Sequence, residues 1–269
     1  MTEHPMIFQP ESVRGLLAKP PTKWQTRRVA TAQNSLINGS GEWIRSDWQY
    51  LDWSKARVDI GPSPAGNPGP YFHVPFRRPD YGDDCPIYRV YPRVQPGDLV
   101  RIRETWRPVM EGYHSYIEYK ACSPDLQVLD AREKFKNLKA IYHVVPGGSS
   151  LPSYSKAWHS PLHLPREWSR AWLRVSGVRG QRLQDISEED AKAEGARLLY
   201  WYAPTADEDT HVTLSGANAS HLNGFATQWT SINRKKPSRR WEANPIVWAY
   251  SVDRVLNRVE ADEYLREAV

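Results

Sequence analysis

The sequence predicts an α+β fold, a small mixed β-barrel with short flanking helices and long loop insertions. Three observations lead to this prediction. Several short segments alternate apolar and polar residues, as half-buried strands do. A few short segments carry helical periodicity with capping residues at their ends. Between them lie stretches dense in proline, glycine and serine, which are typical of surface loops.

The first expected element is a short N-terminal helix. Val13, Leu16 and Leu17 lie at the spacing of one helical face, and Pro20 ends the pattern. In chain order, the expected elements are a helix over 10–19, a strand or extended loop over 22–29, strands over 99–106, 116–120, 140–145 and 170–178, helices over 187–195 and 225–233, and a closing strand over 246–255.

The central strands follow clear local signals. Residues 96–98 read Pro-Gly-Asp, and this is turn chemistry because proline fixes one φ angle and glycine permits a positive one. The strand over 99–106 therefore begins directly after a turn. Residues 170–178 alternate apolar and polar side chains, as a strand with one buried face does.

The helix over 187–195 is predicted from both of its ends. Ser187 is a suitable N-cap, Asp190 occupies the acidic position of a capping box, and Gly195 is the expected residue after the last turn. The remaining stretches are read as insertions, with a candidate hairpin at 43–53 inside the first of them. The insertions are 31–95, 146–157 and 198–226.

The composition narrows the class of protein. Twelve Trp and fourteen Tyr against five Phe give aromatic side chains with a polar group, which suit binding clefts and base stacking as well as half-wet packing. A net charge of +5 permits nucleic-acid contact without requiring it. Cys85 and Cys122 cannot build a disulfide framework. No apolar stretch approaches the ~20 residues of a membrane span, so we expect a cytoplasmic protein with no membrane partner.

The sequence gives no sign of a metal or another cofactor. His159 and His163 have the spacing of two metal ligands on one helix, but Pro161 lies between them and argues against a helix there. We therefore expect no bound metal and no other cofactor.

Read in order, a series of short motifs resembles the larger ASCH-domain proteins of phages and prophages, within the PUA-like superfamily. The match covers about half the chain, and it is the order of the motifs that makes it specific. The motifs are Lys23-x-x-Thr26-Arg27-Arg28, Pro96-Gly97-Asp98 before Arg103-Glu104-Thr105-Trp106, His163-x-Pro165-Arg166, Leu183-Gln184-Asp185-Ile186-Ser187, Glu194-Gly195, Trp229-x-Ser231-Ile232-Asn233 and Trp241-Glu242-Ala243-Asn244-Pro245.

This resemblance implies a single ASCH-type, PUA-like barrel over residues 1–269, with a cleft beside it. The superfamily is associated with RNA binding and modified bases. Some small ASCH proteins are amidohydrolases that remove acyl groups from N(4)-acetylcytidine and related nucleosides, using a Lys, a Thr three residues later and a Glu. Lys23 and Thr26 match the first two, and Glu194 falls where the third is expected. Another branch is linked to ribonuclease activity, so the fold alone does not fix the chemistry.

Each residue of the implied catalytic set would take one role in amide hydrolysis. The Thr26 hydroxyl would attack the amide carbon, Lys23 would take its proton if burial or a cationic neighbour favours the neutral amine, and Glu194 would assist proton transfer to the leaving nitrogen. Each residue also has an ordinary structural reading. A lysine beside two arginines is as often a phosphate-binding or solvated basic patch, and a threonine in a strand is commonly a packing residue.

Other side chains are candidates for binding. Trp24 and Trp106 could stack on a pyrimidine ring, with Arg27 and Arg28 beside the substrate. The densest basic run would suit a phosphate backbone if it lies at the rim of the fold, and is otherwise a solvated loop. This run contains Arg234, Lys235, Lys236, Arg239 and Arg240.

Three functions therefore remain open. The first is an amidohydrolase acting on acylated cytosine nucleosides or related modified bases. The second is a non-catalytic module that binds RNA, DNA or a modified base, and the third is a ribonuclease. The expected partner is a nucleoside or modified-base substrate, with RNA or DNA as the alternative, and the sequence leaves the oligomeric state open.

Overall fold

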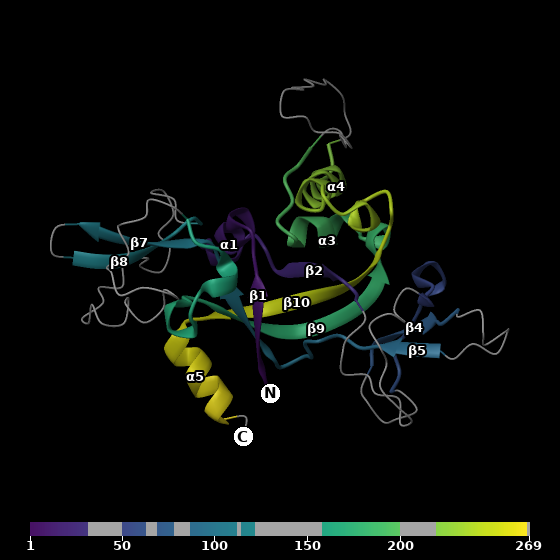
Figure 1. Cartoon of the computed structure of the whole chain (residues 1–269), viewed down its shortest axis with the longest axis horizontal. Helices are drawn as coiled ribbons and strands as arrows, with labels where there is room; N and C mark the ends of the chain where they lie inside the picture. Colours follow the sequence, from purple (N-terminus) through teal and green to yellow (C-terminus); the bar gives the residue numbers. More distant parts are fainter. Residues whose placement is uncertain are drawn as a thin grey trace. The chain divides into compact units, whose positions relative to one another are not determined.

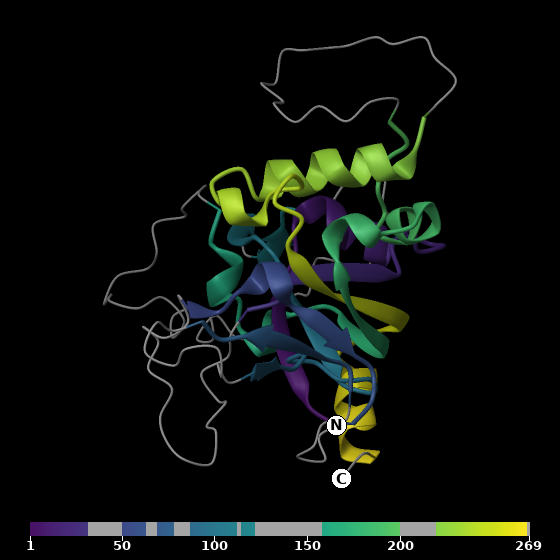
Figure 2. The same ribbon diagram turned by 90° about the vertical axis from the view of Figure 1, so that its right-hand side faces the viewer.

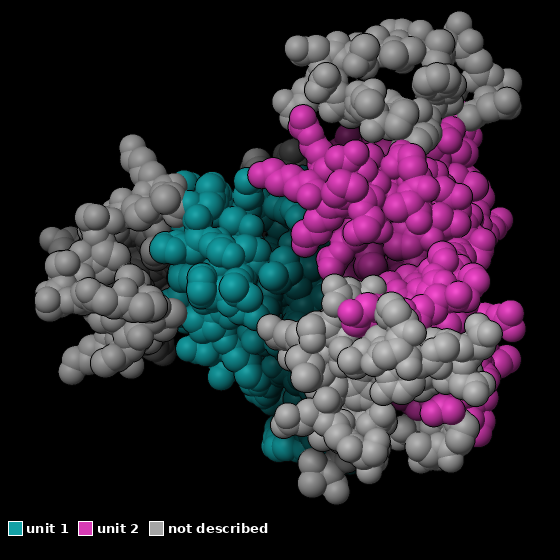
Figure 3. Space-filling view, turned by 45° about the vertical axis from the view of Figure 1, so that its right-hand side comes forward, with its two compact units in different colours: residues 1–24, 96–176, 252–269 teal, residues 25–95, 177–251 magenta. Residues whose placement is uncertain are grey.

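The computed structural model describes residues 1–31, 50–62, 69–77, 87–111, 114–121, 158–199 and 219–267. It combines three β-sheets with a few short helices, which confirms the predicted α+β class. The chain divides into two compact units, shown in different colours in Figure 3. Unit 1 comprises residues 1–24, 96–176 and 252–269, and unit 2 comprises residues 25–95 and 177–251.

Unit 1 holds a parallel strand pair and a hairpin. Strand β1 pairs in parallel with β6, and β7 pairs with β8 in an antiparallel hairpin (Figure 1). Helix α1 buries the three apolar residues whose spacing predicted it. The elements are β1 (Glu3–Ile7), α1 (Pro10–Leu17), β6 (Leu99–Arg103), β7 (Trp106–Glu111), β8 (His114–Tyr119), the 3-10 turns η4 (Pro161–His163) and η5 (Arg166–Trp168), and α5 (Arg258–Glu267).

Unit 2 holds a small sheet and a helix pair. Strands β3, β4 and β5 form an antiparallel three-stranded sheet, and α4 packs alongside α3 (Figure 2). The elements are β2 (Gln25–Val29), η2 (Trp53–Lys55), β3 (Arg57–Asp59), β4 (Tyr71–Pro75), β5 (Ile87–Val90), η6 (Leu183–Asp185), α3 (Glu188–Ala193), α4 (His221–Ile232) and η7 (Pro237–Arg239).

Two long strands, β9 (Trp172–Arg182) and β10 (Ile246–Leu256), contribute residues to both units. They are the third and fourth strands of a sheet with the order β1-β6-β9-β10-β2. In unit 2, β10 pairs antiparallel with β2, so that Tyr250 lies opposite Thr26 and Trp248 opposite Arg28. Among the described strands this sheet ends at β1 and β2 and does not close on itself.

Strands β9, β10 and β2 form the middle layer of unit 2. One face packs against the small sheet, where the ring centroids of Phe72 and Trp248 lie 4.4 Å apart. A Cβ atom at Gly180 would lie 2.7 Å from the Phe72 ring, so this close approach requires glycine. The other face carries Val29 and Val247, which pack beneath α3 and α4 with Phe225 and other apolar side chains of those helices.

The structure confirms most of the expected elements that it describes. Helix α3 has the predicted ends, and α4 begins four residues earlier than expected. The segment 31–95, expected as an insertion, contributes β3, β4 and β5 to unit 2. The strand expected at 140–145, the insertion at 146–157, most of that at 198–226 and residues 43–49 of the expected hairpin lie outside the described residues. The described end of that hairpin, 50–53, leads into the turn η2.

The helices that the structure describes are short. None of them has both the length and the apolar character needed to cross a bilayer.

Candidate functional site

Arg27 lies at the centre of a buried group of charges in unit 2. Its guanidinium donates to Glu194 Oε1 at 3.0 Å and to Asp190 Oδ2 at 2.8 Å. Asp190 also accepts from Gln25 Nε2 at 2.8 Å and from Arg179 Nη2 at 2.7 Å. Only 2% of Arg27 is exposed. Two carboxylates are thus held by two arginines beneath α3, and Arg27 is the buried member of the pair.

The two ends of α3 set the positions of the two carboxylates, Asp190 in the first turn and Glu194 after the last. Ser187 caps the helix by accepting from the backbone N–H of Asp190 at 3.1 Å, as the sequence predicts. Gly195 has a φ of 75°, the left-handed conformation that ends a helix, so Glu194 becomes the C-cap residue. A carboxylate at this end opposes the helix dipole. The bond from Arg27 compensates for it.

The Asp190 carboxyl is held in its charged form. Burial alone would raise its pKa, but the Gln25 amide and the charges of Arg27 and Arg179 outweigh burial and keep the pKa below its ordinary value. The carboxylate therefore serves as a fixed negative charge.

Arg28 lies on the other face of β2 from Arg27, because successive side chains of a strand point to opposite faces. Burial lowers the pKa of the Arg28 guanidinium, and the nearby charge of Glu194 and the Tyr250 phenol oppose this shift. Burial also raises the pKa of Tyr250 to about 12, so the phenol stays neutral near pH 7. Arg28 and Tyr250 thus lie close enough within unit 2 for the charge of each to shift the pKa of the other.

The three residues of the expected catalytic set are all buried. Lys23 is 4% exposed, Thr26 3% and Glu194 6%, and such burial is unusual for lysine and glutamate. Thr26 lies on the face of β2 opposite to Arg27, the residue that binds Glu194. Lys23 belongs to unit 1, and Thr26 and Glu194 belong to unit 2. Their joint catalytic role stays a prediction.

The two tryptophans expected to stack on a base differ in exposure. Trp24, in unit 1, is 37% exposed. Trp106 is 4% exposed, and its ring stacks on His159 at a centroid distance of 4.7 Å. It belongs to a core cluster with Trp168 and Tyr119, so packing accounts for its position. A role for either tryptophan in substrate binding stays a prediction.

The basic segment (residues 234–240) is an ordered turn in unit 2. The Trp229 indole donates to the backbone carbonyl of Arg239 at 2.6 Å, and the Arg240 guanidinium donates to the carbonyl of Arg234. Lys235 and Lys236 are exposed. Within the described part of the chain, none of the five cationic side chains of the segment is in an ion pair. The segment therefore presents positive charge that no acidic side chain among the described residues neutralises.

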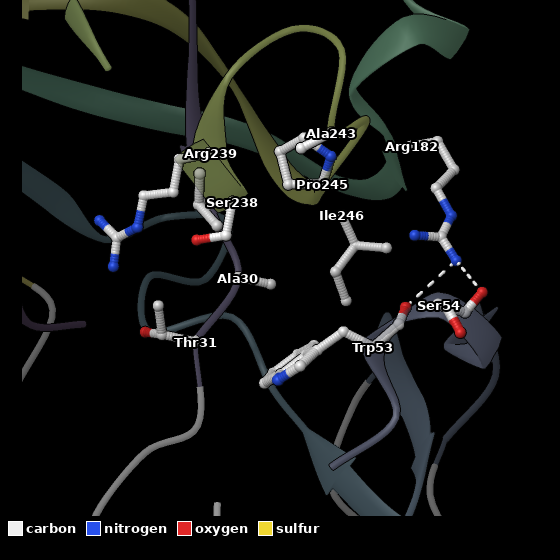
Figure 4. A pocket seen from close by; sticks show the side chains of 11 residues that line it. Ala30, Thr31, Trp53, Ser54, Arg182, Ser238, Arg239, Ala243, Pro245 and Ile246 are labelled. Carbon is white, nitrogen blue, oxygen red and sulfur yellow. Dashed lines mark hydrogen bonds between the residues drawn. The ribbon is translucent and has the colours of Figure 1, made fainter. Parts of the chain in front are cut away.

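A pocket of about 390 Å³ opens next to the basic segment, within unit 2 (Figure 4). Its walls include Trp53 from η2, Arg182 from the end of β9 and Arg239 from the basic segment, with Ile246 and Pro245 as apolar surface. Sequence reasoning identified Arg239 but missed Trp53 and Arg182. Tryptophans stand at positions 43, 48 and 53 of the sequence, but no local pattern links them to residues 182 or 239.

Neither a metal centre nor a known relative defines the site. In the residues that the structure describes, no three His, Cys, Asp or Glu side chains are grouped as metal ligands. Comparisons with protein-family models, with curated proteins and with solved structures find no match. The resemblance to ASCH-domain proteins stays a prediction, and the geometry of unit 2 carries the functional argument.

Proposed function

We propose that the protein binds nucleic acid, and that the basic segment of unit 2 contacts the phosphate backbone. The observation that carries this proposal is the concentration of five cationic side chains in residues 234–240 without an ion-pair partner among the described residues. Charges of this kind release condensed counterions from nucleic acid when they meet its phosphates. The backbone bonds that order the segment reduce the entropy lost on binding.

Equilibrium binding to labelled single- and double-stranded RNA and DNA oligonucleotides tests this proposal. Affinity should fall steeply between 50 and 200 mM salt. The double substitution Lys235→Ala, Lys236→Ala should reduce the slope of log K against log[salt] by about 1.4–1.8, because each phosphate contact contributes roughly 0.7–0.9. The charge-matched control is Lys19→Ala, Lys120→Ala, which removes two exposed cations of unit 1. Equal slopes in the two variants would refute the assignment.

A second candidate function is hydrolysis of acylated cytosine derivatives. The burial of Lys23, Thr26 and Glu194 favours it, because buried polar side chains need a structural or chemical reason. Chain connectivity also keeps the Cα atoms of Lys23 and Thr26 within about 10 Å. Incubation with N(4)-acetylcytidine and longer acyl analogues should release cytidine. Turnover that persists in Lys23→Ala and in Thr26→Ala would reject this function.

Both functions are compatible with an ASCH-type, PUA-like barrel, and we propose that the sheets of this protein belong to such a fold. The ordered series of motifs supports this proposal, as does the packing of the β3-β4-β5 sheet across one face of β9, β10 and β2. An experimentally determined structure in which the strands do not form this barrel would overturn it.

A further inference from the structure

The pocket next to the basic segment has the size and the lining of a small-molecule site. Its volume of about 390 Å³ falls in the range of ligand pockets, roughly 300–1,000 Å³. We call it the Trp53 pocket. Much of its surface comes from apolar residues such as Ala30, Pro245 and Ile246. Of the described residues that line it, two are arginines and none carries a carboxylate.

The aromatic wall of the pocket is held in place by its own turn and by Arg182. Trp53 begins η2, and the Asp52 carboxylate caps this turn by accepting from Ser54 N at 3.2 Å. The Arg182 guanidinium donates to the backbone carbonyls of Trp53 at 3.2 Å and Ser54 at 2.6 Å. Figure 4 shows these two bonds beside the pocket. Arg182 is therefore a positioning residue, which fixes the turn that carries the indole.

Arg239 supplies the charge. It lies on the opposite side of the pocket from Arg182, next to Ser238 and Thr31 (Figure 4). Its backbone is fixed by Trp229 and Lys236, and its side chain has no ion-pair partner among the described residues. Figure 4 shows the Trp53 ring at the pocket and the Arg239 guanidinium extending outward at its edge. An indole in an apolar pocket with a guanidinium at its edge matches a ligand with a planar ring and an anionic group that reaches out of the pocket. A purely apolar ligand would leave Arg239 unused, and a bare anion would not need the apolar wall.

We propose that the Trp53 pocket accepts one unstacked nucleotide, with its base against the Trp53 ring and its phosphate at Arg239. This inference rests on the proposed function, because Ser238 and Arg239 belong both to the pocket and to the basic segment. A strand whose phosphates follow the segment would deliver a single base into the pocket. Stacking on an aromatic ring tolerates any base, so shape and charge, more than base identity, govern entry.

Calorimetric titration of the full-length protein with AMP, UMP, their nucleosides and inorganic phosphate tests this site. The wild type should bind nucleotides more tightly than nucleosides or phosphate. Trp53→Leu should weaken nucleotide binding about tenfold to a hundredfold, as loss of one base–aromatic stack predicts. Trp53→Phe should retain most of the wild-type affinity for nucleotides, because phenylalanine keeps an aromatic ring. Arg239→Gln should abolish the preference for nucleotide over nucleoside.

The outcomes separate the pocket from the basic segment. The Lys19→Ala, Lys120→Ala variant should keep wild-type mononucleotide affinity. In Lys235→Ala, Lys236→Ala the oligonucleotide salt slope should fall while the preference for nucleotide over nucleoside persists. Salt-sensitive oligonucleotide binding that is unchanged in Trp53→Leu, with no mononucleotide binding by the wild type, would overturn the pocket and keep the proposed function. Mononucleotide binding without oligonucleotide binding would keep the pocket as a nucleotide site and overturn the proposed function. If Trp53→Leu does not fold, Trp53→Phe and Arg239→Gln decide the question by the nucleotide-to-nucleoside ratio.

Discussion

Replacing Arg27 by methionine should destabilise unit 2 severely. The substitution removes two hydrogen bonds to carboxylates, at 3.0 Å to Glu194 and 2.8 Å to Asp190. Hydrogen bonds to charged groups contribute about 1.5–3 kcal/mol each. The side chain of Glu194 is only 5% exposed, so its charge would be left buried without its Arg27 partner. Breaking a buried pair in this way costs about 3–5 kcal/mol, and we expect a loss of this size.

Urea unfolding of the wild type and variants at pH 7, followed by tryptophan fluorescence, measures this loss. Arg179→Met is the matched control, because it removes a bond to the same Asp190 carboxylate from a side chain that is 53% exposed. The control should cost less than about 1 kcal/mol. Adding Glu194→Gln to Arg27→Met removes the buried charge that has lost its Arg27 partner, so the double variant should be more stable than Arg27→Met alone. Equal costs for Arg27→Met and Arg179→Met would refute the reasoning.

Three further predictions concern unit 2. Gly224→Ala should destabilise the protein by more than about 1 kcal/mol, because the alanine Cβ would lie 1.8 Å from the carbonyl oxygen of Arg197. Alanine normally favours a helix over glycine, so a rise in melting temperature on thermal denaturation would contradict this prediction. Ser187→Ala should lower the free energy of unfolding by about 1 kcal/mol, because α3 loses its N-cap. Urea unfolding measures this, and an unchanged free energy would contradict the prediction. The lowered pKa of Asp190 means that its carboxylate stabilises the fold above its ordinary value of 3.8 and loses this effect as the pH falls through the folded value. The stability difference between Asp190→Asn and the wild type should therefore shrink in acid, and a difference independent of pH would show that this carboxylate is not responsible.

Local sequence signals located the helices of unit 2 well. Ser187 and Gly195 gave both ends of α3, because capping depends on residues within a few positions of each other. Helix α5 was missed although its capping box was readable: Asn257 accepts from Glu260 N at 3.1 Å, and Glu260 accepts from Asn257 N at 2.8 Å. Its apolar stripe is short, because only Ala261 is buried and Tyr264 and Leu265 are partly buried against the same core cluster, so the periodic signal in the sequence was weak.

The small sheet of unit 2 was hidden for a different reason. Proline and glycine are dense around β3 and β4, and this composition predicted a surface excursion. The sheet is stabilised by a non-local contact, since Phe72 packs on Trp248 from the far end of the chain. Short-range patterns carry no information about such a contact.

The candidate site was predictable only in part. The basic segment was readable because its charges are consecutive in sequence. The Trp53 pocket was not, because its walls come from four separate segments that the fold brings together. The partner of Glu194 was also unforeseen. The guanidinium of Arg27 binds Glu194 and Asp190, and its expected place beside the substrate stays a prediction.

Photo-crosslinking is the most direct test of nucleic-acid binding at unit 2. An oligonucleotide carrying 5-iodouridine at each position in turn would be bound, irradiated and mapped by peptide mass spectrometry. The proposal predicts crosslinks to Trp53 and to peptides of the basic segment, lost in the Trp53→Leu and the Lys235→Ala, Lys236→Ala variants respectively. Crosslinks confined to peptides of unit 1, or their persistence in both variants, would contradict it.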